Sequence, residues 1–197
     1  MGKIKISRAD KRVFKLTDRI QNPFDLTNHL PFRVATAANL MALNRDLNIR
    51  QQTGLETREM RVLINIGSYM PITSADIAYQ SRMETSSISR SVSVLIQKGL
   101  IEALKDPTNR RNKKLVLTNE GQTLYDKLSV LMDDRSKVIE KALTAQEKET
   151  LFSLLDRIES ETEKHLAEFA LSEQASGEDI PADQKELIRW YRKSNES

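Results

Sequence analysis

The chain contains no cysteine, and only two of its 197 residues are histidine. Without cysteine there is no disulfide, no thiolate metal ligand, no cysteine nucleophile and no thiol-based redox switch. The two histidines, His29 and His165, are too far apart in the sequence to suggest a zinc site. We therefore expect neither a bound metal nor a cofactor.

Glycine is also scarce, and long apolar runs are missing. The six glycines form no phosphate-cradling loop, and the sequence shows no paired-carboxylate motif or nucleophile–base constellation. We therefore expect no catalytic residues and no enzymatic activity. No stretch approaches the roughly 18 consecutive apolar residues of a membrane span, and the first residues lack the apolar segment of a signal peptide. A cytoplasmic protein without a membrane partner is expected.

Charge of both signs is present but unevenly distributed around a formal net value of +3. Residues 1–23 carry seven basic against two acidic side chains, and residues 82–114 carry eight against three. Residues 140–197 carry fourteen acidic against eight basic side chains. A basic arm and a basic central segment suggest a polyanionic partner, although a solvated protein face can show the same pattern.

Most of the chain has the apolar periodicity of helices. A first helical stripe begins near Leu26, is expected to bend at Pro31 and ends at Gly54, and Thr57 is a plausible N-cap for the next helix. The exception is a pair of short apolar runs, 100–104 and 114–117, around a basic, turn-rich loop, which predicts a β-hairpin. Later helices are expected from Thr118 and from the capping-box signature at 144–147, and a linker at 172–182.

One predicted helix has an unusual polar face. Its buried stripe is Ile88, Val92, Leu95 and Ile96, and it stops at Lys98-Gly99. The opposite face carries side chains that are small, polar or cationic: Thr85, Ser86, Ser89, Arg90 and Ser93. Such a face can approach base edges closely and exchange hydrogen bonds with them. Hydroxyls that only cap and solvate the helix, and an Arg90 paired with a carboxylate, are the alternatives.

Residues 57–121 resemble the winged helix-turn-helix of MarR-type transcription regulators. The resemblance rests on three strings: Asp106-Pro-Thr-Asn-Arg-Arg-Asn-Lys-Lys-Leu-Val-Leu-Thr-Asn-Glu-Gly121, Ser87-Ile-Ser-Arg90 and Gly99-Leu-Ile101. Asn109 departs from the family pattern, which often has an aspartate there. The resemblance implies a mainly α fold with a small β-hairpin wing, in which a winged helix-turn-helix domain joins a helical dimerisation body.

DNA is the partner that both the residues and the resemblance indicate. We predict that the contacting residues are Thr85, Ser86, Ser87, Ser89, Arg90, Arg110, Arg111 and Lys113. The serine-rich helix would enter the major groove, and Lys113 would lie over phosphates. The resemblance implies that one wing-tip arginine enters the minor groove, and Arg111 is our first choice. A solvated turn is the alternative for the hairpin tip.

A homodimer is expected, because one recognition helix reads too few base pairs to be selective. Two-fold symmetry would place half-sites of a pseudo-palindromic operator roughly 34–36 Å apart. The long apolar stripes outside the winged helix would form the dimer interface, as the resemblance also implies. The expected organisation is a basic N-terminal arm (1–23), a first helix of the dimerisation body (24–56), the winged helix-turn-helix (57–121), a helical dimerisation region (122–170), and a linker with a short C-terminal helix (171–197).

The resemblance further implies a repressor that is relieved by a small anionic or aromatic effector. His29 and Arg33 lie one helical turn apart and could hold a carboxylate together, with Phe32 as an apolar wall. A solvated His and Arg on a helix surface are the alternative. Two other functions stay open: an effector-independent or architectural DNA-binding protein, and a winged-helix module that binds other proteins.

Overall fold

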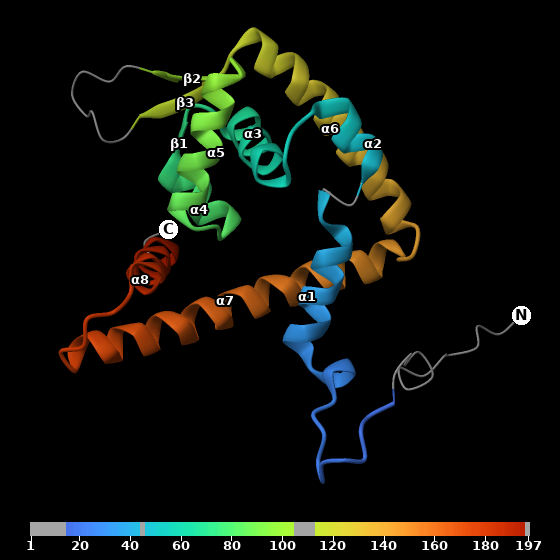
Figure 1. Cartoon of the computed structure of the whole chain (residues 1–197), viewed down its shortest axis with the longest axis vertical. Helices are drawn as coiled ribbons and strands as arrows, with labels where there is room; N and C mark the ends of the chain where they lie inside the picture. The colour runs from blue at the N-terminus through green and yellow to red at the C-terminus, as the bar shows by residue number, and fades with distance from the viewer. Residues whose placement is uncertain (1–14, 44–45, 105–112, 196–197) are drawn as a thin grey trace, which may run out of the picture. The chain divides into compact units, whose positions relative to one another are not determined.

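The structure is a computed structural model that describes residues 15–43, 46–104 and 113–195 (Figure 1). The chain forms two compact units, Met1–Gln52 and Thr53–Ser197. Arg110 and Arg111, the predicted wing-tip arginines, lie outside the described residues. In the part of the chain that is described, no helix is long and apolar enough to cross a membrane.

The first unit is helical but does not hold the single helical stretch expected up to Gly54. A one-turn 3₁₀ helix, η2 (Leu26–Asn28), precedes α1 (Leu30–Met41), and α2 (Leu47–Thr53) follows as a separate helix. The backbone N–H of Ile49 donates to the side chain of Asp46 at 3.2 Å, so a new helix start is capped there. Pro31 lies in the first turn of α1, where its missing N–H interrupts no helical hydrogen bond.

The second unit begins with three helices around a shared core. They are α3 (Thr57–Tyr69), α4 (Ser74–Ser81) and α5 (Thr85–Gln97). Helix α3 starts at Thr57 with Glu56 as its N-cap, one residue earlier than expected, because Glu56 and Glu59 form a capping box. Between them these helices bury the apolar side chains Met60, Leu63, Ile66, Ile77, Ile88 and Leu95.

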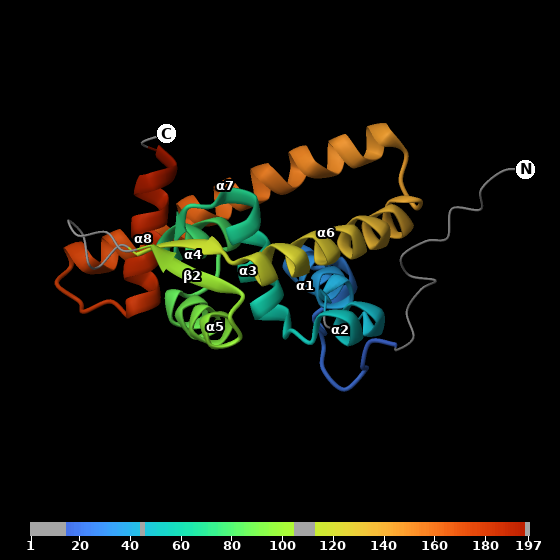
Figure 2. The same ribbon diagram turned by 90° about the horizontal axis from the view of Figure 1, so that it is seen from above.

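A three-stranded antiparallel sheet lies beside these helices (Figure 2). The predicted hairpin forms as β2 (Ile101–Leu104) and β3 (Lys114–Leu117), in a register that pairs Ile101 with Leu117. A third strand, β1 (Ile72–Thr73), pairs with β3 and makes the strand order β1-β3-β2. Sequence reasoning missed β1, since two residues are too few to show an alternating pattern.

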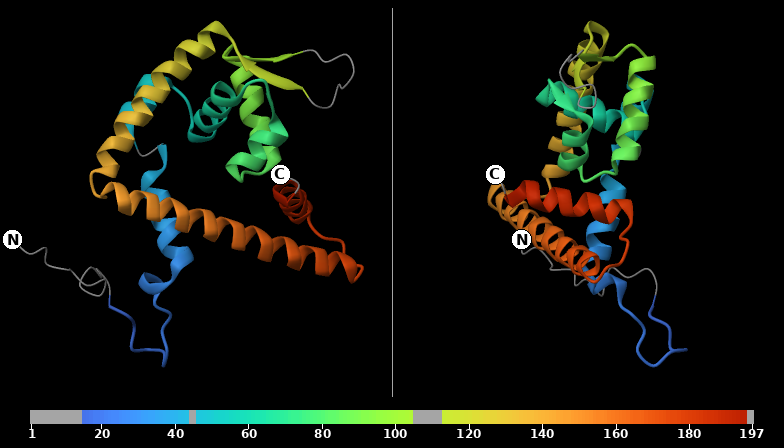
Figure 3. Two further views of the ribbon diagram at one scale, coloured as in Figure 1. Left: turned by 180° about the vertical axis from the view of Figure 1, so that it is seen from behind. Right: turned by 90° about the vertical axis from the view of Figure 1, so that its left-hand side faces the viewer.

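Three long helices complete the second unit: α6 (Asn119–Glu140), α7 (Ala145–Ala175) and α8 (Ala182–Asn195). Thr118 caps α6, and the capping box at the start of α7 forms as predicted. Helix α7 runs into the expected linker and stops at Gly177, whose φ is +89°. From there α8 returns beside the C-terminal part of α7 (Figure 3), and Ile180 and Ile188 pack on Ala170.

Apolar side chains that face solvent are frequent on α6 and α7. The most exposed are Val130, Val138, Ile139, Leu151, Phe152, Leu154, Leu166 and Phe169, each between 39% and 66% exposed. In the first unit, α1 has no buried residue at all. Apolar surface on this scale is typical of helices that pack against a further partner.

We predict that Gly121→Ala destabilises the second unit. A Cβ at this position would lie 1.8 Å from the backbone oxygen of Leu100, which cannot move aside as a flexible side chain can. The free energy of unfolding in urea should fall by about 1–3 kcal/mol. Glu120→Ala, at the exposed neighbouring position, is the control and should change it by no more than about 0.5 kcal/mol. Equal effects of the two variants would contradict this close approach.

Candidate nucleic-acid interface

Helices α4 and α5 are joined by a tight turn that makes a helix-turn-helix. Thr73 caps α4 by accepting the N–H of Asp76 at 3.2 Å, and α4 ends at Arg82 with φ +50°. This left-handed backbone costs a non-glycine residue of the order of 1–3 kcal/mol. The guanidinium of Arg82 offsets part of that cost by donating to the Tyr79 carbonyl at 2.6 Å and to Glu163 at 2.7 Å.

Helix α5 has the two faces that the sequence predicts, with one correction. Ile88, Val92 and Leu95 are buried as expected, but Ile96 is 44% exposed. Eight residues along a helix bring Ile96 about 80° round from Ile88, so it lies at the edge of the stripe. The helix ends at Lys98, and Gly99 follows with φ +69°, in agreement with the predicted stop signal.

The polar face of α5 is open to solvent at four positions: Ser86, Ser89, Arg90 and Ser93. The Nε of Arg90 donates to the carbonyl of Ser86 at 3.3 Å, and the hydroxyl of Ser93 donates to the carbonyl of Ser89 at 3.0 Å. Arg90 forms no ion pair with any described carboxylate. Its charge is thus available to an external anion.

Two of the five predicted contacts on α5 have a different setting. Ser87 is 8% exposed and faces the interior of the second unit with Ile88. Thr85 is half-buried, and its hydroxyl donates to a carboxylate oxygen of Glu186 on α8. The main-chain N–H of Thr85 also points to Glu186, at 3.5 Å. The pattern of apolar and polar residues in α5 alone predicts neither the burial of Ser87 nor the contact of Thr85, because both depend on segments distant in sequence.

Glu186 therefore lies at the N-terminus of α5. The N-cap residue of α5, Glu84, makes no side-chain capping bond, and the first turn contains no acidic residue. The first N–H groups of a helix lack internal partners and favour a negative charge. Glu186 is only 7% exposed, and a carboxylate is stable at such burial only when polar groups compensate for lost water. The helix terminus and the Thr85 hydroxyl supply that compensation.

Further polar contacts join α8 to α4 and α7. The Nζ of Lys193 lies 2.5 Å from Asp76, and the hydroxyl oxygens of Ser194 and Tyr79 lie 3.0 Å apart. Burial alone would raise the pKa of Asp76, but hydrogen bonds from Lys193 and Thr73 and the Lys193 charge outweigh it and hold this pKa below its ordinary value. The stabilisation from this pair is present at neutral pH and is lost as the pH falls through that lowered pKa.

The remaining predicted residues lie on other elements. Lys113 is exposed and immediately precedes β3, in the hairpin that follows α5. In the first unit, His29 is the N-cap of α1, and its ring meets the ring of Phe24 edge-on at 5.0 Å. Phe32 is 41% exposed. Arg33 is exposed one turn beyond His29, and its backbone N–H donates to the carbonyl of His29 at 3.0 Å.

Comparison with known proteins agrees with this geometry. Residues 55–113 match the sequence profile of the MarR family. These residues therefore form a MarR-type domain. The HTH-type transcriptional regulator BilQ of Clostridium symbiosum is 28% identical over 116 residues, which are 59% of this chain and 81% of that protein. The predicted family and the predicted fold class are thus confirmed.

Solved MarR-type structures share the fold. The Staphylococcus aureus MepR–DNA complex has a TM-score of 0.62 at 19% identity and covers 68% of this chain and 98% of its own. The PcaV transcriptional regulator from Streptomyces coelicolor, solved with its natural ligand, has a TM-score of 0.60 at 21% identity and covers 70% and 96%. The chain is a MarR-type DNA-binding transcription regulator.

We predict that Glu186→Ala loosens α8 from the MarR domain, because it removes the acceptor of Thr85. Trp190 is the only tryptophan of the chain and lies on α8, so its fluorescence emission should shift to longer wavelength. Asp183→Ala removes the same charge from an exposed position on α8 and should leave the emission unchanged. An unshifted spectrum of the Glu186 variant would show that this contact does not hold α8.

Proposed function

We propose that the protein is a dimeric, sequence-specific repressor of a pseudo-palindromic operator and that a small molecule relieves repression. DNA binding is supported above all by the solvent-facing side of α5. There, small hydroxyl side chains surround Arg90, which has no carboxylate partner among the described residues. Short side chains let the helix backbone lie close to base edges, and the longer Arg90 side chain can reach a guanine edge or a phosphate. A DNA-binding regulator works where the chromosome is, so we also propose a cytoplasmic location.

The proposed DNA contacts fall into two groups, one on α5 and one on the wing. Ser86, Ser89 and Arg90 read base edges in the major groove, with Arg90 bidentate to a guanine or on a phosphate. The wing carries Lys113 over phosphates and Arg111, or its neighbour Arg110, into the minor groove. Thr85 contacts DNA only when Glu186 has left it, and Ser87 supports the helix from its buried side. The MepR–DNA complex, which shares this fold, supports DNA as the partner.

A second copy of the chain is the partner that best fits the exposed apolar surfaces of α1, α6 and α7. A 12-residue helix such as α1, with no buried residue, gains too little from its own hydrogen bonds to be stable alone. Packing of α1, α6 and α7 against those of a second copy would bury these side chains. We therefore propose that residues 24–56 and 122–170 form the dimerisation body.

For the effector, we propose that His29 and Arg33 bind an anionic group, with Phe32 as the apolar wall. The support is their placement one turn apart at the start of α1 and the PcaV structure, which was solved with its natural ligand. A ligand that still releases DNA from a His29→Ala, Arg33→Ala double variant would contradict this site. Only a ligand whose affinity differs between the DNA-bound and free states can act in this way.

An architectural DNA-binding role is the second candidate, favoured by the basic arm at residues 1–23. Such a protein would bind duplexes tightly without selecting a sequence, and its affinity would fall steeply with salt. A steep salt dependence with no sequence preference would move the assignment to this role. A winged-helix module for protein binding would show only a shallow salt dependence.

We predict that Arg90→Ala and Arg111→Ala each weaken binding to a duplex that carries the selected site by about 1–3 kcal/mol, because each removes one specific contact. Fluorescence anisotropy titrations at several salt concentrations measure both affinity and salt slope. Arg157→Ala, on the exposed surface of α7, removes the same charge far along the chain from the DNA-binding helix and should have little effect. A loss below a few tenths of a kcal/mol for Arg111 would exclude its minor-groove role.

We predict that Leu154→Glu weakens self-association at least about tenfold, since it places a charge on the apolar face of α7 and 1.4 kcal/mol corresponds to that factor. Ser160→Glu introduces the same charge on the polar surface of α7 and should leave the dimer intact. Sedimentation velocity at micromolar concentration reports both. A wild-type chain that sediments as a monomer would contradict the proposed dimer.

A further inference from the structure

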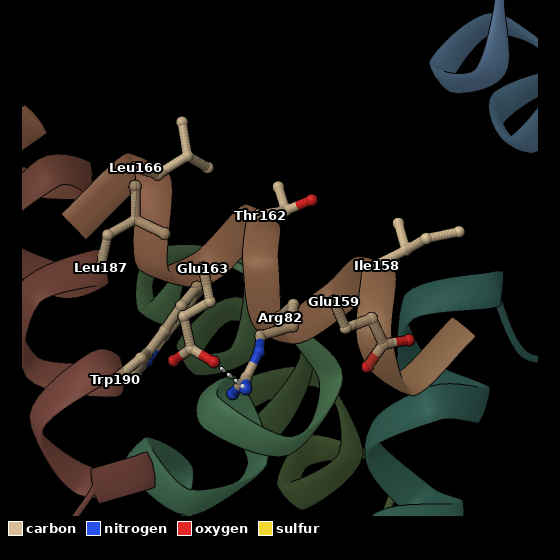
Figure 4. A pocket seen from close by; sticks show the side chains of 8 residues that line it. All are labelled: Arg82, Ile158, Glu159, Thr162, Glu163, Leu166, Leu187 and Trp190. Carbon is tan, nitrogen blue, oxygen red and sulfur yellow. Dashed lines mark hydrogen bonds and ion pairs between the residues drawn. The ribbon is translucent and has the colours of Figure 1, made fainter. Parts of the chain in front are cut away.

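A cavity of about 290 Å³ lies where α7, α8 and the turn before α5 meet (Figure 4). It belongs entirely to the second unit and involves none of the residues proposed above for the effector. Apolar atoms make up most of its wall, and they come from Ile158, Leu166, Leu187 and Trp190. A mainly apolar cavity with a few polar groups at one side is the usual form of a small-molecule site.

The charged side chains of this cavity make it unfavourable for an anion. Its one cation, Arg82, already donates to Glu163 at 2.7 Å and lies over the rings of Tyr79, at 4.3 Å, and Trp190, at 5.7 Å. Figure 4 shows the ion pair of Arg82 and Glu163 at the centre of the site, with Glu159 beside it. Glu159 forms no ion pair with the other described residues. With Arg82 neutralised by Glu163, the wall retains the negative charge of Glu159.

We propose that this cavity binds a two-ring aromatic molecule that carries a positively charged amine. Its rings fill the apolar part beside Leu187 and Trp190, and its amine meets the Glu159 carboxylate. The volume is at the lower end of drug-sized pockets, which suits a ligand of two rings. Trp190 adds an aromatic face, the type of surface that attracts cations best.

Occupancy of the cavity acts on the DNA-binding helix, a step that rests on the proposed function. Leu187 and Trp190 are on α8, and the neighbouring Glu186 accepts the hydrogen bond from Thr85 at the N-terminus of α5. A ligand that bridges α7, α8 and Arg82 is bound only while α8 is docked. It therefore stabilises the state in which Thr85 is engaged by Glu186, and it lowers affinity for DNA.

Three probes with the same two-ring skeleton test the proposal: biphenylmethylamine, biphenylmethanol and biphenylcarboxylate. They are titrated into the full chain without DNA, with Trp190 fluorescence as the local readout and calorimetry for affinity. The amine should bind about tenfold more tightly than the carboxylate, with the alcohol between them, as expected for one nearby charge that water screens in part. Equal or tighter binding of the carboxylate, or no change in Trp190 emission with any probe, overturns the proposal.

Two matched variants test whether the Glu159 carboxylate recognises the amine. Glu159→Gln should reduce the preference for the amine over the carboxylate to within about threefold, because it removes the charge and keeps the shape. Glu161→Gln, two residues along α7 and not part of the cavity, should keep the full preference. Equal preferences in the two variants would show that Glu159 does not recognise the amine.

The coupling to DNA is read separately. Saturating biphenylmethylamine should weaken wild-type binding to a duplex but leave a Glu186→Ala variant unaffected, since that variant has lost the contact between α8 and α5. Equal weakening in both proteins would refute the coupling while leaving the binding site in place. If the chain bound no DNA at all, the proposed function would fail, but the fluorescence titration would still decide whether the cavity binds the amine.

Discussion

The N-terminus of α5 is the place on which the functional surface depends. The first N–H groups of a helix have no partner within the helix and attract negative charge. In this chain the N-cap residue, Glu84, provides no capping side chain, and the acceptor for Thr85 is Glu186 on α8, 101 residues after Thr85. A DNA phosphate would use the same terminus. We therefore propose that the carboxylate and the nucleic acid compete for this position, so that the docking of α8 opposes DNA binding.

This arrangement makes the C-terminal helix part of the DNA-binding unit rather than an appendage. Its apolar side, with Ile188, packs on the end of α7, while Glu186 and Lys193 reach α5 and α4. Arg82, in the turn between those two helices, connects the same region to α7 through Glu163. The ion pairs of Lys193 and Arg82 are partly exposed, and such pairs contribute little individually. If α8 undocks when DNA binds, as we propose, a ligand that binds only the docked state shifts this equilibrium.

The sequence predicts local features well and distant contacts poorly. The stripe of Ile88, Val92 and Leu95, the stop at Gly99 and the capping box of α7 each depend on residues within one or two turns, and all three agree with the structure. Strand β1 is too short for a periodic signal, and the start of α2 depends on one capping bond from Asp46. The burial of Ser87 and the contact of Thr85 with Glu186 arise only when separate helices pack. No pattern within α5 or α8 reports such a pairing.

We propose that the exposed face of α5 and the adjacent wing read a specific DNA sequence as a symmetric pair. Selection of bound duplexes from a random pool, with affinities then measured over a range of salt concentrations, tests it most directly. We expect recovery of a pseudo-palindrome with half-sites about one helical turn apart, roughly 34–36 Å. Recovery of no common sequence, with tight binding that depends only on salt, would contradict it.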